Sequence, residues 1–471
     1  MSDPTEEQRD DAPPPSTSAP RLVFGSHTED AGAIANRALA IASEVMKRDG
    51  MPGADVVVRV HRRAAANVRF ARNEPTTAGE SDEIVTAIEV ALGSRHAATS
   101  TNQLDDGAVA ASAARALAMA KLSPEDSERM PLIGAQSYAT VPSAWDDDLA
   151  TMGPKVRAAI ATRAIARGDQ AKVQIAGFFE REALERVIAS SAGLMARHRE
   201  TSCAYTVTAR TTDGRGSGWS GREAHRVRDV EDDLIASVAI DKALRTVDAR
   251  SVPPGKYSVI LEPQAVFELL AFLVQAMDQR SADEGRSFFA NKVGQRLFAE
   301  IVSLRSDPAD AVTPSAPFDD EGLPLTTHPW ISEGRVNKLH VSRYWAKKKS
   351  LTPTGTHRTF HLSGGQADST DELIKGTKRG LYVTRFWYNR MLEPQSIMVT
   401  GLTRDGLFLI EDGKITGPVT NFRFNESPIT MLKNVDAMTR AATRVVSRGG
   451  VWQVPALRTH EFTMASPSAA V

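Results

Sequence analysis

The chain has 471 residues, of which 41% are hydrophobic and 24% charged, so we expect a globular protein with more than one hydrophobic core. The 57 basic residues nearly balance the 58 acidic ones, and a net charge of −1 gives no electrostatic reason to bind nucleic acid or an anionic membrane. The single cysteine, Cys203, excludes an internal disulfide and any zinc site that needs two cysteines of this chain.

Residues 1–21 are acidic and rich in proline, without the basic and apolar regions of a signal peptide, and we expect a disordered tail. The most apolar run, residues 265–277, is too short to cross the roughly 30 Å hydrocarbon core of a bilayer. We therefore expect no membrane association and a cytoplasmic protein.

Residues 22–123 are predicted to form an N-terminal α/β domain. Apolar residues recur at helical spacing over residues 31–48, and an alanine-rich run favours a second helix. The predicted elements are a helix at 31–48, strands at 54–61, 69–73 and 84–92, and a helix at 106–122.

Residues 124–250 are predicted to contain a linker followed by a mixed middle domain. The expected elements are helices at 152–167 and 232–247 and strands at 173–180, 182–189, 201–211 and 222–230. Cys203 lies in an alternating run, and we expect a packed thiol there and not a nucleophile. The glycine-rich stretch 213–221 matches no phosphate-binding spacing and is predicted to be a flexible hairpin tip.

Residues 251–471 are predicted to form a β-rich C-terminal domain that carries one core helix, from Gln264 to about Arg280. Val266, Leu269, Leu270 and Leu273 line one face of that helix at helical spacing. Farther along, Asp412-Gly413 between two apolar runs indicates a hairpin. The expected fold class is thus α+β.

Several short motifs occur in an order that resembles the TldD/PmbA family over residues 25–465. They are GES (79–81), ATSTN (98–102), RSFFA (286–290), FDDEGLP (318–324), SRYWA (342–346), TRFWY (384–388), GLTRDG (401–406), IEDGKITGP (410–418) and TNFRFN (420–425). The resemblance implies a peptidase built from two kinds of subunit, in which one kind carries HExxxH on a helix and binds zinc through both histidines and a later cysteine.

In this chain the corresponding helix has Phe267, Glu268 and Phe272 where the motif has its first histidine, glutamate and second histidine. Phenylalanine has no lone pair to donate to a metal, and no cysteine follows Cys203 in the sequence. We therefore expect no metal and no cofactor in this chain and zinc in its partner. Glu268 is retained, and its role is left open between a hydrogen-bonded carboxylate of a core helix and a group that reaches the partner's zinc cavity.

Other polar residues are weaker metal candidates. His357 and His361 would stand about 13 Å apart in a strand, too far apart for one ion. His328 and His340 are isolated, and the acidic triplet Asp319–Glu321 is predicted to be a solvated turn.

Four residues are candidates for binding a substrate or partner: Arg385, Tyr388, Arg423 and Asn425. Strand alternation predicts Arg385 with Trp387 on one face, and Phe386 with Tyr388 on the other. Charged and amide groups on rigid strands suit the recognition of an extended peptide, and a polar sheet surface or subunit contact is the equally weighted alternative.

The sequence therefore predicts the metal-free, TldE-like subunit of a TldD/TldE-like zinc metallopeptidase that degrades or processes unfolded or modified peptides. Its expected partners are an HExxxH-bearing TldD-like homologue and a peptide substrate. The alternatives are a peptide-binding or scaffolding homodimer and a metallopeptidase with an unrecognised metal site.

Overall fold

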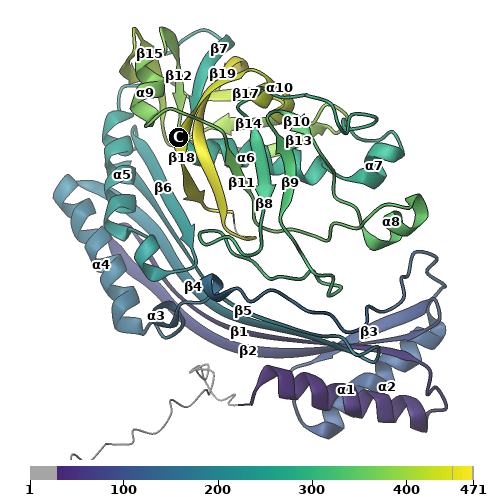
Figure 1. Ribbon diagram of the computed structural model, residues 1–471. Coiled ribbons are helices and arrows are strands. Elements are labelled where there is room, and N and C mark those ends of the chain that lie inside the picture. The colour runs from purple at the N-terminus through teal and green to yellow at the C-terminus, as the bar shows by residue number, and fades with distance from the viewer. Residues whose placement is uncertain (1–28, 448, 469–471) are drawn as a thin grey trace, which may run out of the picture.

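The computed structural model describes residues 29–447 and 449–468. The predicted tail, residues 1–21, lies outside the described residues. Two β-sheets organise the chain: a long curved sheet built by the first half, and a second sheet, from the C-terminal half, on its concave side (Figure 1). The structure confirms the expected α+β class.

The long sheet is antiparallel throughout, with the strand order β3-β2-β1-β4-β5-β6. Its strands are β1 (Asp55–Ala71), β2 (Glu74–Leu92), β3 (Arg95–Thr101), β4 (Val173–Ser190), β5 (Met195–Thr211) and β6 (Ser217–Ala224). Residues on both sides of the predicted linker thus share one sheet, and the division of the chain near residues 123 and 250 stays a prediction.

Several predicted strand limits are wrong because the strands are longer than their local sequence indicates. The strands predicted at 54–61 and 69–73 are one strand, β1, and those at 173–180 and 182–189 are likewise one strand, β4. Pairing on both sides satisfies the backbone of β1 across Ala64, Ala65 and Ala66, whose small side chains have little strand preference of their own. The strand expected at 222–230 ends at Ala224 and is followed by the 3-10 turn η2 (Val227–Asp229).

Helices cover the convex face of the long sheet in two groups (Figure 1). At one end lie α1 (Ala31–Arg48) and α2 (Asp106–Leu122), and at the other end lie α3 (Asp147–Ala150), α4 (Pro154–Ala171) and α5 (Asp232–Arg245), with the 3-10 turn η1 (Pro142–Ala144) nearby. The predicted limits of α1 and α2 are confirmed, and each begins at an aspartate N-cap that accepts a backbone N–H, Asp30 and Asp105.

The second sheet winds around one buried helix. Its strands are β7 (Gly255–Leu261), β8 (Ser303–Ser306), β9 (His328–Ser332), β10 (Arg335–Val336), β11 (His361–Ser363), β12 (Arg379–Val383), β13 (Phe386–Glu393), β14 (Met398–Thr403), β15 (Leu407–Glu411), β16 (Lys414–Pro418), β17 (Phe422–Glu426), β18 (Val435–Val445) and β19 (Trp452–Pro467). The predicted hairpin at Asp412-Gly413 joins β15 to β16.

The core helix of this half is α6 (Pro263–Ala276), and its apolar face, predicted from the spacing, is fully buried. Proline at its first position fits the helix start, where no N–H is needed. The helix is shorter than predicted, because the segment up to Arg280 breaks into a separate short helix, α7 (Gln279–Asp283). The remaining helices are α8 (Arg343–Lys349), α9 (Thr370–Lys375) and α10 (Pro428–Lys433).

Candidate functional site

The helix α6 carries aromatic rings at the two positions compared with zinc-binding histidines. Phe267 packs edge-on against Trp452, with 5.2 Å between ring centroids, and Trp452 in turn packs on Phe360 at 4.6 Å. Phe272 packs against the hydrophobic core of the C-terminal half. A benzene ring donates no electron pair to zinc, so these side chains do not fit the metal. Among the described residues, no group of three or more His, Cys, Asp or Glu side chains has an arrangement that could hold a metal ion.

Glu268 ties α6 to the start of β13. Its Oε1 accepts a hydrogen bond from Gln264 Nε2 at 3.2 Å, and its Oε2 accepts from the backbone N–H of Phe386 at 2.5 Å. Burial raises the pKa of Glu268 to about 7, against the opposing effect of the Arg385 guanidinium. The carboxyl group can therefore exchange a proton close to neutral pH.

Arg385 lies at the contact between the two sheets. Its guanidinium stacks over Trp219 of β6, 4.3 Å from the ring centroid, and lies 3.4 Å from the buried carboxylate of Asp405. Asp405 also accepts a hydrogen bond from Ser217 Oγ at 2.5 Å. These contacts join β6 to the C-terminal half, and they surround a side chain that the sequence proposed for substrate binding.

The other three candidates lie together on β13 and β17. Arg423 pairs with Leu402 of β14, which also pairs with Trp387 of β13, so these positions form one row across three strands. Asn425 lies on β17 two residues farther along, half-buried, whereas Arg423 is exposed. Phe422 and Phe424 point inward, as predicted.

The predicted alternation in β13 fails at Tyr388. Phe386 is buried, but Tyr388 is 63% exposed, as is its neighbour Trp387 at 43%. Tyr388 has a φ of +58°, and a β-bulge between Trp387 and Arg390 turns its side chain out of the core. Tyr388, Arg390 and Trp387 therefore form an exposed patch on β13, whose pairing within the described sheet is with β14.

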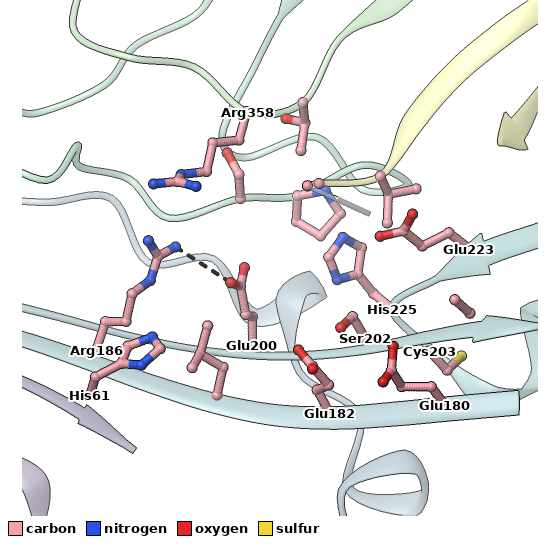
Figure 2. Close-up of a pocket in the computed structure, with 18 of the residues that line it drawn as sticks. His61, Glu180, Glu182, Arg186, Glu200, Ser202, Cys203, Glu223, His225 and Arg358 are labelled. Atoms are coloured by element: carbon pink, nitrogen blue, oxygen red, sulfur yellow. Dashed lines mark hydrogen bonds and ion pairs between the residues drawn. The ribbon is translucent and has the colours of Figure 1, made fainter. Parts of the chain in front are cut away.

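A cavity of about 750 Å³, lined by both apolar and charged side chains, lies between the inner, concave face of the long sheet and loops of the C-terminal half (Figure 2). We call it the inner cavity. The long sheet contributes its inward charged and polar side chains, and the C-terminal half contributes loop residues at 314–315, 318–320, 358–359, 446 and 449–451. The polar side chains from the sheet are Arg59, His61, Glu180, Glu182, Arg186, Glu200, Ser202, Thr206, Glu223 and His225.

The inner cavity adjoins α6. Gln264 exchanges two hydrogen bonds with the backbone of Val446, which lines the cavity, at 3.1 and 3.2 Å. Val451, another lining residue, precedes the Trp452 that packs on Phe267. The helix α6 is therefore bonded directly to a wall of the cavity.

The pKa values of several acidic and histidine side chains in the cavity are shifted from their ordinary values. Burial alone would raise the pKa of Glu200, but His198 and the Arg186 guanidinium outweigh it and lower that pKa to about 2. Burial lowers the pKa of both His61 and His225, which favours their neutral forms. A signal for this site was present in the sequence: Glu180, Glu182 and Arg186 fall at even positions of a strand, so they share a face.

The histidines that were weaker metal candidates pack against other side chains. His357 packs between His328 and Trp330, with ring centroids 4.9 and 5.5 Å away, and burial lowers its pKa to about 3. His361 lies on β11, 3.0 Å from Arg305. These histidines pack against aromatic and basic neighbours.

Two further predictions can be compared with the structure. Asp319 is not solvated as expected: it is buried, and its Oδ1 accepts the N–H groups of Glu321 and Leu323. Cys203 is a packed thiol, as predicted, whose pKa is raised by burial. The glycine-rich stretch holds the β5–β6 turn, as expected of a hairpin, although Gly218 and Gly221 belong to β6.

Comparison with known proteins assigns the family. Models of the PmbA/TldA metallopeptidase match three consecutive stretches of the chain: domain 1 at 56–120, the central domain at 147–247 and the C-terminal domain at 254–466. The chain therefore belongs to the PmbA/TldD family of metallopeptidase-like proteins, as the motifs indicated.

Two curated relatives are metalloproteases of archaea. The chain is 25% identical to one from Methanothermobacter thermautotrophicus over 273 residues, covering 53% of this chain and 58% of that protein. It is 26% identical to one from Methanocaldococcus jannaschii over 224 residues, covering 44% of this chain and 48% of that protein. The matches thus span about half the length of these relatives.

The fold is similar to that of a solved structure, TldE from Thermococcus kodakarensis. The TM-score is 0.83 at 17% sequence identity, and the match covers 92% of this chain and 100% of that one. None of the helices in residues 29–447 and 449–468 is long and apolar enough to cross a membrane.

Proposed function

We propose that this chain is the metal-free subunit of a TldD/TldE-like zinc metallopeptidase. It pairs with a homologue that carries HExxxH, and the pair degrades or processes unfolded or modified peptides. The observation that carries the proposal is the packing of Phe267 against Trp452, which fills with aromatic carbon the position where the family motif has a metal-binding imidazole.

The role of the chain is then to complete a substrate chamber whose zinc belongs to the partner subunit. Tyr388 and Arg423, which are exposed on β13 and β17, contact an extended peptide or the partner, and the half-buried Asn425 lies beside them. Arg385 contributes by holding β6 against the C-terminal half. Glu268 positions the start of β13 through the N–H of Phe386.

The test is to purify this chain and an HExxxH-bearing homologue from the same genome, separately and after co-expression. We expect an unstructured peptide to be cleaved by the pair alone, with zinc bound in the pair and not in this chain alone. Peptide cleavage by the lone chain that a chelator abolishes would contradict the proposal. A lone chain that remains a homodimer beside the homologue would favour the scaffolding alternative.

The candidate residues on β13 and β17 can be tested in the same assay with Tyr388→Ala and Arg423→Gln. If these residues bind substrate, KM rises several-fold while the two subunits still co-purify. If they bind the partner, co-purification is lost. Arg167→Gln is the matched control, because Arg167 is a half-buried arginine on α4, on the far side of the long sheet, where it pairs with Asp233 of α5. Unchanged cleavage and pairing in both the Tyr388 and the Arg423 variants would remove these residues from the proposed site.

A further inference from the structure

The outer face of β13, β14 and β17 is rich in arginine. Alternate residues of β14 and β17 are buried, and the residues between them point away from the core. The register places Trp387 beside Leu402 and Leu402 beside Arg423, so one outward row crosses all three strands. We call this surface the arginine face, and its side chains are Arg385, Trp387, Tyr388 and Arg390 at β13, Thr400, Leu402 and Arg404 at β14, and Arg423 and Asn425 at β17.

Two of these arginines share one carboxylate of the fold. Arg385 and Arg404 lie 3.4 and 3.8 Å from the same oxygen, Oδ2 of the buried Asp405. The Arg385 guanidinium also lies close enough to the buried Glu268 to lower the pKa of that carboxyl, against the larger effect of burial. The charges of Arg385 and Arg404 are therefore balanced within the protein.

The other two arginines of the face, Arg390 and Arg423, have no carboxylate partner in the part of the chain that the structure describes. Both are exposed, and Arg390 stacks over the ring of Tyr388, 4.4 Å from its centroid. Glu393, at the end of β13, uses its two oxygens to accept backbone N–H groups of the following turn at 2.7 and 2.6 Å. Arg390 and Arg423 can therefore each bind a carboxylate from outside the chain.

An apolar centre lies between these two arginines. The ring of Trp387 is 43% exposed, and the guanidinium groups of Arg385 and Arg404 lie 5.2 and 4.9 Å from its centroid. These cation–π contacts hold the ring in a fixed position. Half-buried Leu402 is its neighbour on β14. The centre therefore suits a small aliphatic side chain.

The spacing of the two free arginines fits an extended peptide. Arg390 and Arg423 are two strands apart and one two-residue step apart along the sheet, so their backbones are about 12 Å from each other. In an extended peptide, side chains four residues apart lie on the same side and about 13 Å apart, with the side chain at the second position between them. Two acidic residues at this separation can thus reach both arginines.

We propose that the arginine face binds an acidic segment of the extended peptide substrate, with one carboxylate on Arg390, another on Arg423 and an apolar side chain on Trp387 between them. The inference rests on the proposed function, to which it adds that preferred substrates are acidic. A peptide is favoured over a nucleic acid because the net charge of −1 gives a polyanion no general attraction.

The probe is the capped peptide acetyl-Glu-Ser-Leu-Ser-Glu-amide, tested by calorimetry on the purified full chain at low ionic strength. Its analogue with glutamine at both ends is the control, and single-stranded oligothymidylate is the competing class of ligand. We expect the acidic peptide to bind, the glutamine analogue to bind about fivefold more weakly or worse, and added salt to reduce the difference. No binding, equal binding of both peptides, or tighter binding of the oligonucleotide would overturn the proposal.

Variants test the two contacts. Arg390→Gln and Arg423→Gln change exposed side chains without an ion pair in the described residues, so both should fold normally and bind the acidic peptide about two- to fivefold more weakly. The double variant Arg390→Glu and Arg423→Glu should instead prefer a peptide with lysine at both ends. Arg115→Gln is the matched control, because Arg115 is an exposed arginine on α2, at the far end of the molecule. Unchanged affinity in both glutamine variants would contradict the proposed contacts.

The same segments, placed in unstructured peptides, separate this inference from the proposed function. The co-expressed pair should cleave the acidic peptide with a KM several-fold below that of its glutamine analogue. If the lone chain binds the acidic segment but the pair cleaves neither peptide, the proposed function fails and the arginine face remains a peptide site. If the pair cleaves both equally and the lone chain binds neither, only the further inference fails. Loss of the homologous subunit from the arginine variants, without peptide binding, would make the face a subunit contact and would also overturn it.

Discussion

The two faces of the long sheet come from the same strands and have opposite character. On the convex face, alternate residues such as Ile175 and Phe179 are buried under α4 and α5 in a closed apolar core. On the concave face, the residues that alternate with them along the strand, among them Phe178 and Arg186, line the inner cavity, where several buried polar atoms have no partner within the described residues. Residues on the convex face thus hold the fold together, whereas residues on the concave face line a cavity.

The largest expected effect comes from the adjacent pair Phe178 and Phe179. Phe179→Ala should lower the free energy of unfolding by about 3–5 kcal/mol, because the lost ring leaves a void in a packed core. Phe178→Ala should cost clearly less, since Phe178 is only half-buried and lines the cavity. Denaturant unfolding of both variants measures the difference, and equal losses would break the distinction between the two faces.

The pH dependence of Glu200 tests the electrostatics of the concave face. Its pKa in the fold is about 2 against an ordinary 4.5, so its stabilisation is present above pH 4.5 and is lost as the pH falls toward 2. Glu200→Gln should therefore lower the free energy of unfolding by up to about 3 kcal/mol at pH 7. The gap between variant and wild type should narrow on acidification, and a gap that is constant from pH 7 to pH 3 would contradict this account.

The contribution of Glu268 to stability should change with pH in the opposite direction. Its pKa is raised to about 7 in the fold, so the protonated form is favoured below pH 4.5 and stability is lost as the pH rises from 4.5 through 7. Glu268→Gln, whose amide oxygen can still accept from the N–H of Phe386, should remove that loss and gain up to about 3 kcal/mol on the wild type between pH 4.5 and 8. Thermal unfolding of both proteins across this pH range measures the difference in stability. An identical pH dependence in the variant and the wild type would contradict the prediction.

The smallest expected difference in the free energy of unfolding is between variants of two buried serines, Ser217 and Ser315. Ser217 donates to buried Asp405, and Ser217→Ala should cost about 1–3 kcal/mol because that carboxylate loses a partner. Ser315 has no partner in the described residues, and Ser315→Ala should change stability by less than about 0.5 kcal/mol. The pair is compared by chemical denaturation without added ligand. A large loss at Ser315 would show that its hydroxyl is engaged in the fold and not toward the cavity.

The sequence by itself determined the features that depend on local or compositional physics. The limits of α1 and α2 follow from helical periodicity and from the aspartates Asp30 and Asp105, which act within one turn. The chemistry of Phe267 and Phe272 as non-ligands follows from residue identity alone, whatever surrounds them.

The tertiary structure decided what depends on partners far away in the chain. Ala64 to Ala66 continue β1 because strands on both sides complete their hydrogen bonds, and Tyr388 turns outward because a bulge interrupts pairing with β14. The inner cavity joins His225 to Ser315, ninety positions later, and only the packing of the C-terminal half against the concave face brings those unpaired atoms to the same space. Local periodicity gives the face of the sheet on which a side chain lies. The tertiary fold decides which loops of the C-terminal half lie opposite that face.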